Sequence, residues 1–191
     1  MKKILLLLIL FFGLISSLSA ETNRIVSGNN NAKITIITYA SLTCSHCANF
    51  HKEVYPKLKK DYIDTGLAKI EFRHFPLDVA AFNASKIVQC KQDQGLEILE
   101  SLYSNQQSWV KGNTIENLNQ NLKKFLENEG FDINFEKCVN NKEIEDFVLN
   151  DRIEGTKKFK VDSTPTIIIN NKKFEKSLNY KNLKKFLEKL I

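Results

Sequence analysis

Two cysteines separated by two residues, in the segment Cys44-Ser45-His46-Cys47, are the residues of this sequence best placed to do chemistry. Thiols at this spacing at the start of a helix can close and reopen a small disulfide, and only a thiolate attacks a disulfide. A helix N-terminus stabilises a negative charge by up to about 2 kcal/mol, which lowers a cysteine pKa of about 8.5 by about 1.5 units. Backbone N–H groups and the His46 imidazole can lower the pKa of Cys44 further. Each such interaction stabilises the reduced protein, so the pattern predicts an oxidising disulfide.

The two thiols differ in their expected surroundings. Cys47 lies on the apolar face of the predicted helix with Phe50, so we interpret it as the resolving thiol and Cys44 as the point of attack. A structural disulfide, a zinc half-site and a copper site are the alternatives. Zinc needs two more ligands, and Cys90 and Cys138 lack the paired spacing of a zinc motif. His51 could approach a metal held by the pair, but we expect it on the surface of the helix, and no metal is predicted.

The pattern of apolar residues places the cysteine pair between two predicted strands. Residues 33–39 are β-branched and partly alternating, and residues 67–75 alternate between apolar and charged side chains. Between them a helix is predicted from apolar residues at three- and four-residue intervals, namely Cys47, Phe50, Val54 and Leu58. Pro56 should kink this helix rather than end it. Strand, helix and strand form a parallel crossover, with the cysteines at the turn that leaves the first strand.

A long helical block follows before the pattern returns to strands. Helices are predicted over residues 79–92, 96–106, 133–139 and 142–159, with another around the stripe Ile115, Leu118, Leu122, Phe125 and Leu126. Residues 166–169 then read as a strand, Asn170-Asn171 as a turn and 172–174 as a returning strand. The last helix carries Leu183, Phe186, Leu187 and Leu190. The predicted order is therefore βαβ, a helical insertion, and ββα.

The first 20 residues predict a secretory signal peptide. Lys2 and Lys3 precede an apolar run over residues 4–15, and small residues precede Glu21. The run is too short to cross a bilayer comfortably, since that takes about 20 helical residues; an uncleaved anchor is the alternative. We expect one mature domain over residues 21–191, outside the cytoplasm, where disulfides persist. Without the two lysines the chain has 26 basic and 22 acidic residues, and the net charge of +4 is too small to indicate nucleic-acid binding.

Four features together resemble the DsbA-type thiol-disulfide oxidoreductases of the thioredoxin fold. They are the strand before the cysteine pair, the segment 73–77 (Arg-His-Phe-Pro-Leu), the helical insertion, and the segment 161–166 (Val-Asp-Ser-Thr-Pro-Thr). The resemblance covers nearly the whole of residues 21–191. It implies an α/β thioredoxin fold with a helical insertion at about 79–159.

The resemblance also implies roles for individual residues. Cys44 corresponds to the nucleophile and Cys47 to the resolving thiol, with Ser45 and His46 as the dipeptide that tunes them. Thr164 and Pro165 correspond to a substrate loop in which the proline is cis and lies beside the active disulfide. An X–Pro bond suits this role, because only there is the cis form cheap.

Three positions depart from the best-known members of that family. Thr38 stands six positions before Cys44, where those oxidases have a buried acidic residue that can relay protons. Ser45 replaces the commoner proline, and Thr164 is a residue that isomerase relatives also use. Proton handling, reduction potential and the direction of electron transfer therefore stay open.

Cys90 and Cys138 raise a separate question. Four cysteines allow three pairings, and if Cys44 pairs with Cys47 these two are left together. Some relatives resembling this sequence also carry a second disulfide in the insertion. We interpret the pair as a structural disulfide, which in the chain-entropy model stabilises a loop of this length by roughly 4 kcal/mol. The competing interpretation is a regulatory pair that exchanges electrons with Cys44 and Cys47.

These observations predict a periplasmic thiol-disulfide oxidoreductase that introduces disulfides into reduced or unfolded exported proteins. We expect it to work as a monomer without metal, nucleotide or flavin, and to be reoxidised by a membrane redox partner. An isomerase or reductase of the same fold is the nearest alternative. A metal chaperone that uses Cys44 and Cys47 as ligands is the alternative from a different class.

Overall fold

A computed structural model describes residues 22–191 of the chain. The signal peptide expected over residues 1–20 lies outside the described residues. Within residues 22–191, no helix is both long enough and apolar enough to cross a membrane.

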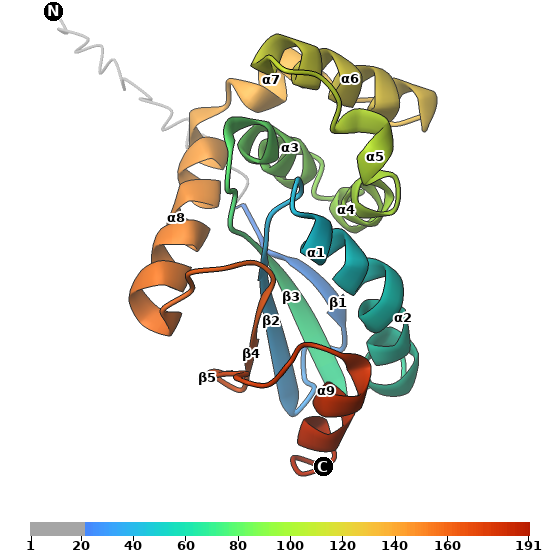
Figure 1. Cartoon of the computed structure of the whole chain (residues 1–191), viewed down its shortest axis with the longest axis vertical. Helices are drawn as coiled ribbons and strands as arrows, with labels where there is room; N and C mark the ends of the chain where they lie inside the picture. Colours follow the sequence, from blue (N-terminus) through green and yellow to red (C-terminus); the bar gives the residue numbers. More distant parts are fainter. Residues whose placement is uncertain (1–21) are drawn as a thin grey trace, which may run out of the picture.

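The centre of the fold is a mixed sheet with the strand order β1-β3-β2-β4-β5 (Figure 1). Its strands are β1 (Ile25–Gly28), β2 (Ile34–Ala40), β3 (Ala68–His74), β4 (Thr166–Ile169) and β5 (Lys172–Lys173). Strands β2 and β3 are parallel, while the β1–β3, β2–β4 and β4–β5 pairs are antiparallel. This is the α/β thioredoxin arrangement that the sequence predicts. Strand β1, which extends the sheet beyond β3, was not predicted.

The alternation of side chains explains how the sheet is covered. In β3, Ala68, Ile70 and Phe72 are buried and the residues between them are half-buried. Strand β2 lies in the middle and is buried on both faces. Ile36 belongs to the larger core, whereas Ile37 belongs to a smaller one on the opposite face. Two faces that both need apolar cover require helices on both sides.

One face of the sheet is covered by the helical segment that begins at the cysteine pair. It consists of α1 (Ser45–Asn49), the π-helical turn η1 (Phe50–Val54), α2 (Tyr55–Leu58) and a second π-helical turn, η2 (Lys59–Ile63). The segment continues past Pro56, which lies in the first turn of α2. Helix α9 (Tyr180–Leu187) packs against α2 (Figure 1).

The insertion between β3 and β4 forms the helical part of the molecule and supplies the cover on the other face. It contains α3 (Val79–Cys90), α4 (Gly95–Ser104), α5 (Gln106–Trp109), α6 (Ile115–Asn128), α7 (Phe135–Val139) and α8 (Lys142–Phe159). Helices α3 to α7 lie beyond one end of the sheet, and α8 runs back along it (Figure 1). Helix α5 was not predicted, because its four residues are too few to show a period.

Ion pairs hold α8 against the sheet. Arg73 of β3 lies 2.8 Å from Glu154, and Arg24 lies 3.3 Å from Asp151. The Asp151 carboxylate is buried and accepts a hydrogen bond from the backbone N–H of His74 at 3.1 Å. Because these contacts fix α8, they also fix the point from which the chain re-enters the sheet as β4.

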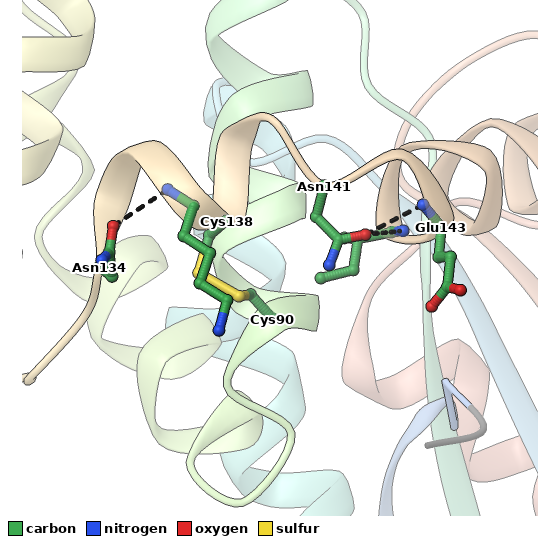
Figure 2. The surroundings of a disulfide bond; sticks show 7 residues. Cys90, Asn134, Cys138, Asn141 and Glu143 are labelled. Carbon is green, nitrogen blue, oxygen red and sulfur yellow. Dashed lines mark hydrogen bonds between the residues drawn. A yellow bond between two sulfur atoms is a disulfide. The ribbon is translucent and has the colours of Figure 1, made fainter. Parts of the chain in front are cut away.

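A disulfide between Cys90 and Cys138 joins α3 to α7, with its Cα atoms 5.6 Å apart and 48 positions apart in the sequence (Figure 2). The helix that carries Cys138, α7, and the helix that follows it, α8, each begin at a side-chain N-cap. Asn134 caps α7 by accepting from the N–H of Lys137, and Asn141 caps α8 by accepting from the N–H of Glu143 (Figure 2). The start of α7 is therefore held by its N-cap as well as by the cross-link to α3.

We predict that replacing both Cys90 and Cys138 with alanine lowers the free energy of unfolding by about 4 kcal/mol, because the unfolded chain regains the entropy of an open loop. Denaturant unfolding of the oxidised protein measures this loss. If the disulfide is structural, the equilibrium of Cys44 and Cys47 with glutathione will not change. A changed equilibrium would instead support the regulatory interpretation.

Candidate active site

Cys44 and Cys47 lie where β2 gives way to α1, at the carboxyl end of a central strand. Cys44 is the N-cap residue of α1, with extended backbone angles, and its carbonyl accepts from the N–H groups of Cys47 and Ala48 at 3.1 Å each. Cys44 is half-buried, whereas Cys47 has 0% of its surface exposed. Both are free thiols in the structure. Of these two sulfurs, only that of Cys44 is therefore within reach of another molecule.

A second loop, which contains the cis Thr164–Pro165 bond, lies against the Cys44 sulfur. The thiol of Cys44 donates a hydrogen bond to the carbonyl of Thr164 at 3.5 Å, across 120 positions of sequence. Beside this contact is an open cavity of about 640 Å³, whose lining includes His46, Phe50, Val54, Pro165 and Leu178. The sequence motif and the cis-proline loop thus meet at one apolar cavity.

Burial and hydrogen bonding give the two thiols different acidities. For Cys44, partial burial raises the pKa, but the approach of the Thr164 hydroxyl and hydrogen bonds from the backbone of Cys47 and His46 outweigh it, so the pKa is lowered. For Cys47, burial dominates and raises the pKa to about 12. At neutral pH, Cys44 is the thiol that ionises more readily.

Ser45 and His46 occupy the exposed first turn of α1, on different sides of the helix. His46 lines the cavity next to Pro165, while Ser45 lines a second cavity between α1 and α5. The backbone N–H of His46 contributes to the lowered pKa of Cys44. The structure therefore brings five of the predicted site residues around the sulfur of Cys44: Ser45, His46, Cys47, Thr164 and Pro165.

Comparison with known proteins agrees with this geometry. A family model described as Thioredoxin matches residues 20–189. The crystal structure of Wolbachia pipientis alpha-DsbA1 superposes with a TM-score of 0.77 at 31% identity, covering 88% of this chain and 90% of that one. The chain is a DsbA-like member of the thioredoxin family.

Curated relatives of this DsbA-like protein carry related names. Disulfide bond formation protein D of Bacillus subtilis is 26% identical over 174 residues, which cover 86% of this chain and 75% of that protein. A putative protein-disulfide oxidoreductase of Rickettsia bellii is 38% identical over 73 residues, which cover 38% of this chain. The match spans only 28% of the Rickettsia protein's length.

Side chains from the start of the insertion hold the loop that leads into Cys44. Thr43 donates a hydrogen bond to Asp78 at 2.6 Å, and the other oxygen of Asp78 caps α3 by accepting from the N–H of Ala81 at 2.7 Å. Ser41 lies 3.3 Å from the Thr43 hydroxyl and accepts from the N–H of Leu77 at 3.3 Å. We did not single out Asp78 from the sequence, although its position directly before a predicted helix is typical of an N-cap.

His51 is not on the surface, and that expectation was wrong. Only 7% of its surface is exposed, and its ring stacks on Tyr103 of α4 with the centroids 4.0 Å apart. Phe50, Tyr55 and Phe72 also contact it. The buried face of this helix is wider than the stripe read from the sequence, because α4 covers the helix on a side that the sheet does not.

The buried imidazole of His51 has an unusual environment for a titratable group. Neither ring nitrogen has a hydrogen-bond partner within the described part of the chain, and burial lowers the pKa of His51 to about 3. Since the ring resists protonation in the folded state, the unfolded chain binds this proton more tightly.

Among residues 22–191, no group of three or more His, Cys, Asp or Glu side chains could hold a metal ion.

Thr38 lies in β2, six positions before Cys44, where the best-known oxidases of the family have a buried acid. It is fully buried, pairs with Phe72 across the β2–β3 ladder, and its hydroxyl has no hydrogen-bond partner in the residues described. A threonine supplies no charge. In this DsbA-like protein, the acidity of the pair is therefore set without a carboxylate at that position.

We predict that His51 makes the fold sensitive to acid. Because its pKa is about 3 in the folded state and 6.5 ordinarily, its contribution to stability is complete above pH 6.5 and is lost as the pH falls towards 3. At about pH 4.5 the loss amounts to roughly 2–3 kcal/mol. The His51→Phe variant keeps an aromatic ring in the stack but has no imidazole to protonate. Denaturant unfolding of the oxidised variant should therefore show a smaller loss of stability between about pH 6.5 and 4.5 than the wild type.

The exposed residue His46 provides the control. A His46→Asn variant keeps the buried imidazole and should retain the pH dependence of the wild type. Equal pH dependence in the wild type and in His51→Phe would show that His51 takes up its proton in the folded state, contrary to this account.

Proposed function

We propose that this DsbA-like protein is an exported thiol-disulfide oxidoreductase that donates a Cys44–Cys47 disulfide to reduced or unfolded exported proteins. The observation that carries the proposal is the difference between the two thiols. An accessible thiol with a lowered pKa precedes, by one helical turn, a buried thiol whose pKa is raised to about 12. The names of the relatives from Bacillus subtilis and Rickettsia bellii support the same chemistry.

The proposed reaction has two exchange steps. A substrate thiolate bonds to the Cys44 sulfur, the Cys44–Cys47 bond breaks, and Cys47 takes up a proton because its pKa is high. A second substrate thiolate then bonds to the first substrate sulfur, which breaks the mixed disulfide and releases Cys44 as a thiolate. Two electrons pass from the substrate to the protein. A membrane redox partner must then remove them, and no metal, nucleotide or flavin takes part.

The cis-proline loop is the proposed site for the substrate chain. Because the carbonyl of Thr164 lies 3.5 Å from the Cys44 sulfur, a peptide bonded to that sulfur must pass alongside Thr164 and Pro165. The adjacent cavity is lined by apolar side chains such as Phe50 and Leu178, which suits the exposed apolar residues of an unfolded protein. His46, on the rim of the same cavity, completes the proposed binding site.

The first test is the reduction potential of residues 21–191 in glutathione buffers, with mass mapping to identify the pair that titrates. We expect Cys44 and Cys47 to titrate near or above about −180 mV, towards the oxidising end of the known range. A value near about −270 mV would indicate a reductase. Net formation of disulfides in a reduced substrate identifies an oxidase, whereas rearrangement of a scrambled substrate without net oxidation identifies an isomerase.

Variants of the pair test the assigned roles. Cys44→Ser should abolish exchange. Cys47→Ser cannot form the Cys44–Cys47 disulfide, but its Cys44 thiolate should attack a disulfide of an oxidised substrate, release one substrate thiolate and stay trapped as a mixed disulfide, because the resolving thiol is gone. Both proteins keep the Cys90–Cys138 disulfide as an internal control of folding. Stoichiometric metal in the purified wild type, together with unchanged metal-free exchange in Cys44→Ser, would contradict the proposal in favour of a metal chaperone.

Export is tested separately from chemistry. When the full chain is produced in a bacterium with two membranes, we expect a monomeric periplasmic product whose first residue is Glu21, because the residues before it have the pattern of a cleaved signal peptide. N-terminal sequencing and cell fractionation measure this outcome. A product that keeps Met1 and stays with the membrane would indicate an uncleaved anchor.

A further inference from the structure

Gln106 is the first residue of α5, a short helix that is firmly attached to the rest of the insertion. The indole of Trp109 at the other end of α5 is fully buried and donates a hydrogen bond to the carbonyl of Leu102 in α4 at 2.9 Å. The carbonyl of Gln106 accepts from the N–H of Val110 at 2.9 Å. The backbone of Gln106 is therefore held in place independently of its side chain.

The side-chain amide of Gln106 reaches across to the loop that carries the nucleophile. Its nitrogen donates to the carbonyl of Leu42 at 2.8 Å and to the carbonyl of Cys44 at 3.1 Å, over 64 and 62 positions of sequence. A primary amide nitrogen has two N–H donors, and both are used here. The two acceptors flank Thr43, whose own side chain is held by Asp78. The loop around Thr43 is thus held by two side chains, the amide of Gln106 and the carboxylate of Asp78.

We propose that Gln106 is a positioning residue for the nucleophile, which holds the first turn of α1 in the orientation that hydrogen-bonds the Cys44 thiolate. The inference rests on the proposed oxidoreductase function and names a residue that controls it. The Cys44 carbonyl held by Gln106 is the same one that accepts from the N–H groups of Cys47 and Ala48 at 3.1 Å. Holding this carbonyl holds the start of the helix.

The chemical type of the side chain fits this role. The backbone N–H groups of His46 and Cys47 stabilise negative charge on the Cys44 sulfur, and both belong to the turn that Gln106 fixes. The amide of Gln106 fixes this turn without adding a negative charge, which would oppose the thiolate. Because the thiolate exists only once the disulfide is reduced, Gln106 stabilises the reduced protein more than the oxidised protein and so strengthens the disulfide as an oxidant.

The test compares Gln106→Met with Gln107→Met in the mature chain, residues 21–191. Methionine has about the length of glutamine but no N–H donor. Gln107 is exposed and follows Gln106 in the same helix, so it is a matched control. The pKa of Cys44 is measured from the ultraviolet absorbance of its thiolate, the thiol-disulfide equilibrium in glutathione buffers, and the stability of both redox forms by denaturant unfolding.

In Gln106→Met we expect a higher pKa for Cys44. The equilibrium with glutathione should shift about five- to tenfold towards the Cys44–Cys47 disulfide, because the reduced form loses the free energy of about one hydrogen bond to the loop. The reduced form should lose more stability than the oxidised form, and Gln107→Met should match the wild type. Equal destabilisation of both forms with an unchanged pKa and equilibrium would show that Gln106 is only structural.

A second variant covers the case in which Gln106→Met does not fold. Gln106→Glu keeps the size of the side chain but directs carboxylate oxygens at two carbonyls, and it should shift the equilibrium in the same direction and further. A shift of the opposite sign overturns the proposal. If the wild type fails to oxidise protein thiols while the pKa of Cys44 still responds to Gln106, the proposed function is wrong and the positioning role stands.

Discussion

The proposed chemistry of this protein depends on two sulfurs that are one helical turn apart and differ in solvation. The N-cap position puts the Cys44 sulfur beside the first turn of α1, whose backbone lowers its pKa, whereas Cys47 is buried in the larger core. Desolvation and hydrogen bonding therefore act in opposite directions on two identical groups. The rest of the fold either supplies the core that buries Cys47 or holds the turn that stabilises Cys44.

The helical insertion contributes to that second task. Its residues reach the loop 41–44 at two points, through Gln106 at the carbonyls of Leu42 and Cys44 and through Asp78 at the Thr43 hydroxyl. A thioredoxin-like sheet with a crossover helix could present the same cysteine pair without these contacts. The insertion thus bears on the orientation of Cys44, the proposed nucleophile, as well as on the size of the molecule. Its Cys90–Cys138 cross-link joins α3 to α7.

Much of this architecture could be predicted from the sequence, because the main elements follow from local periodicity. Helix α8 and strand β4 begin and end where the pattern of apolar residues indicates. The short elements β1 and α5 were missed, since their four residues show neither a period nor the continuous apolar and β-branched run that marks β4. His51 was misplaced because its burial depends on α4, which packs on the helix from a distant part of the sequence. Gln106 has no local signature, because its partners lie more than 60 positions away.

The contact between Cys44 and Thr164 joins the first half of the chain to its last strand pair, 120 positions later. A chain that is synthesised from its N-terminus exposes all four cysteines before that loop exists. Until β4 pairs with β2, the Cys44 sulfur has no cis-proline loop beside it and Cys47 lacks part of its core. The protein is therefore, during its own synthesis, a reduced and unfolded chain of the kind that an enzyme with its proposed activity would oxidise.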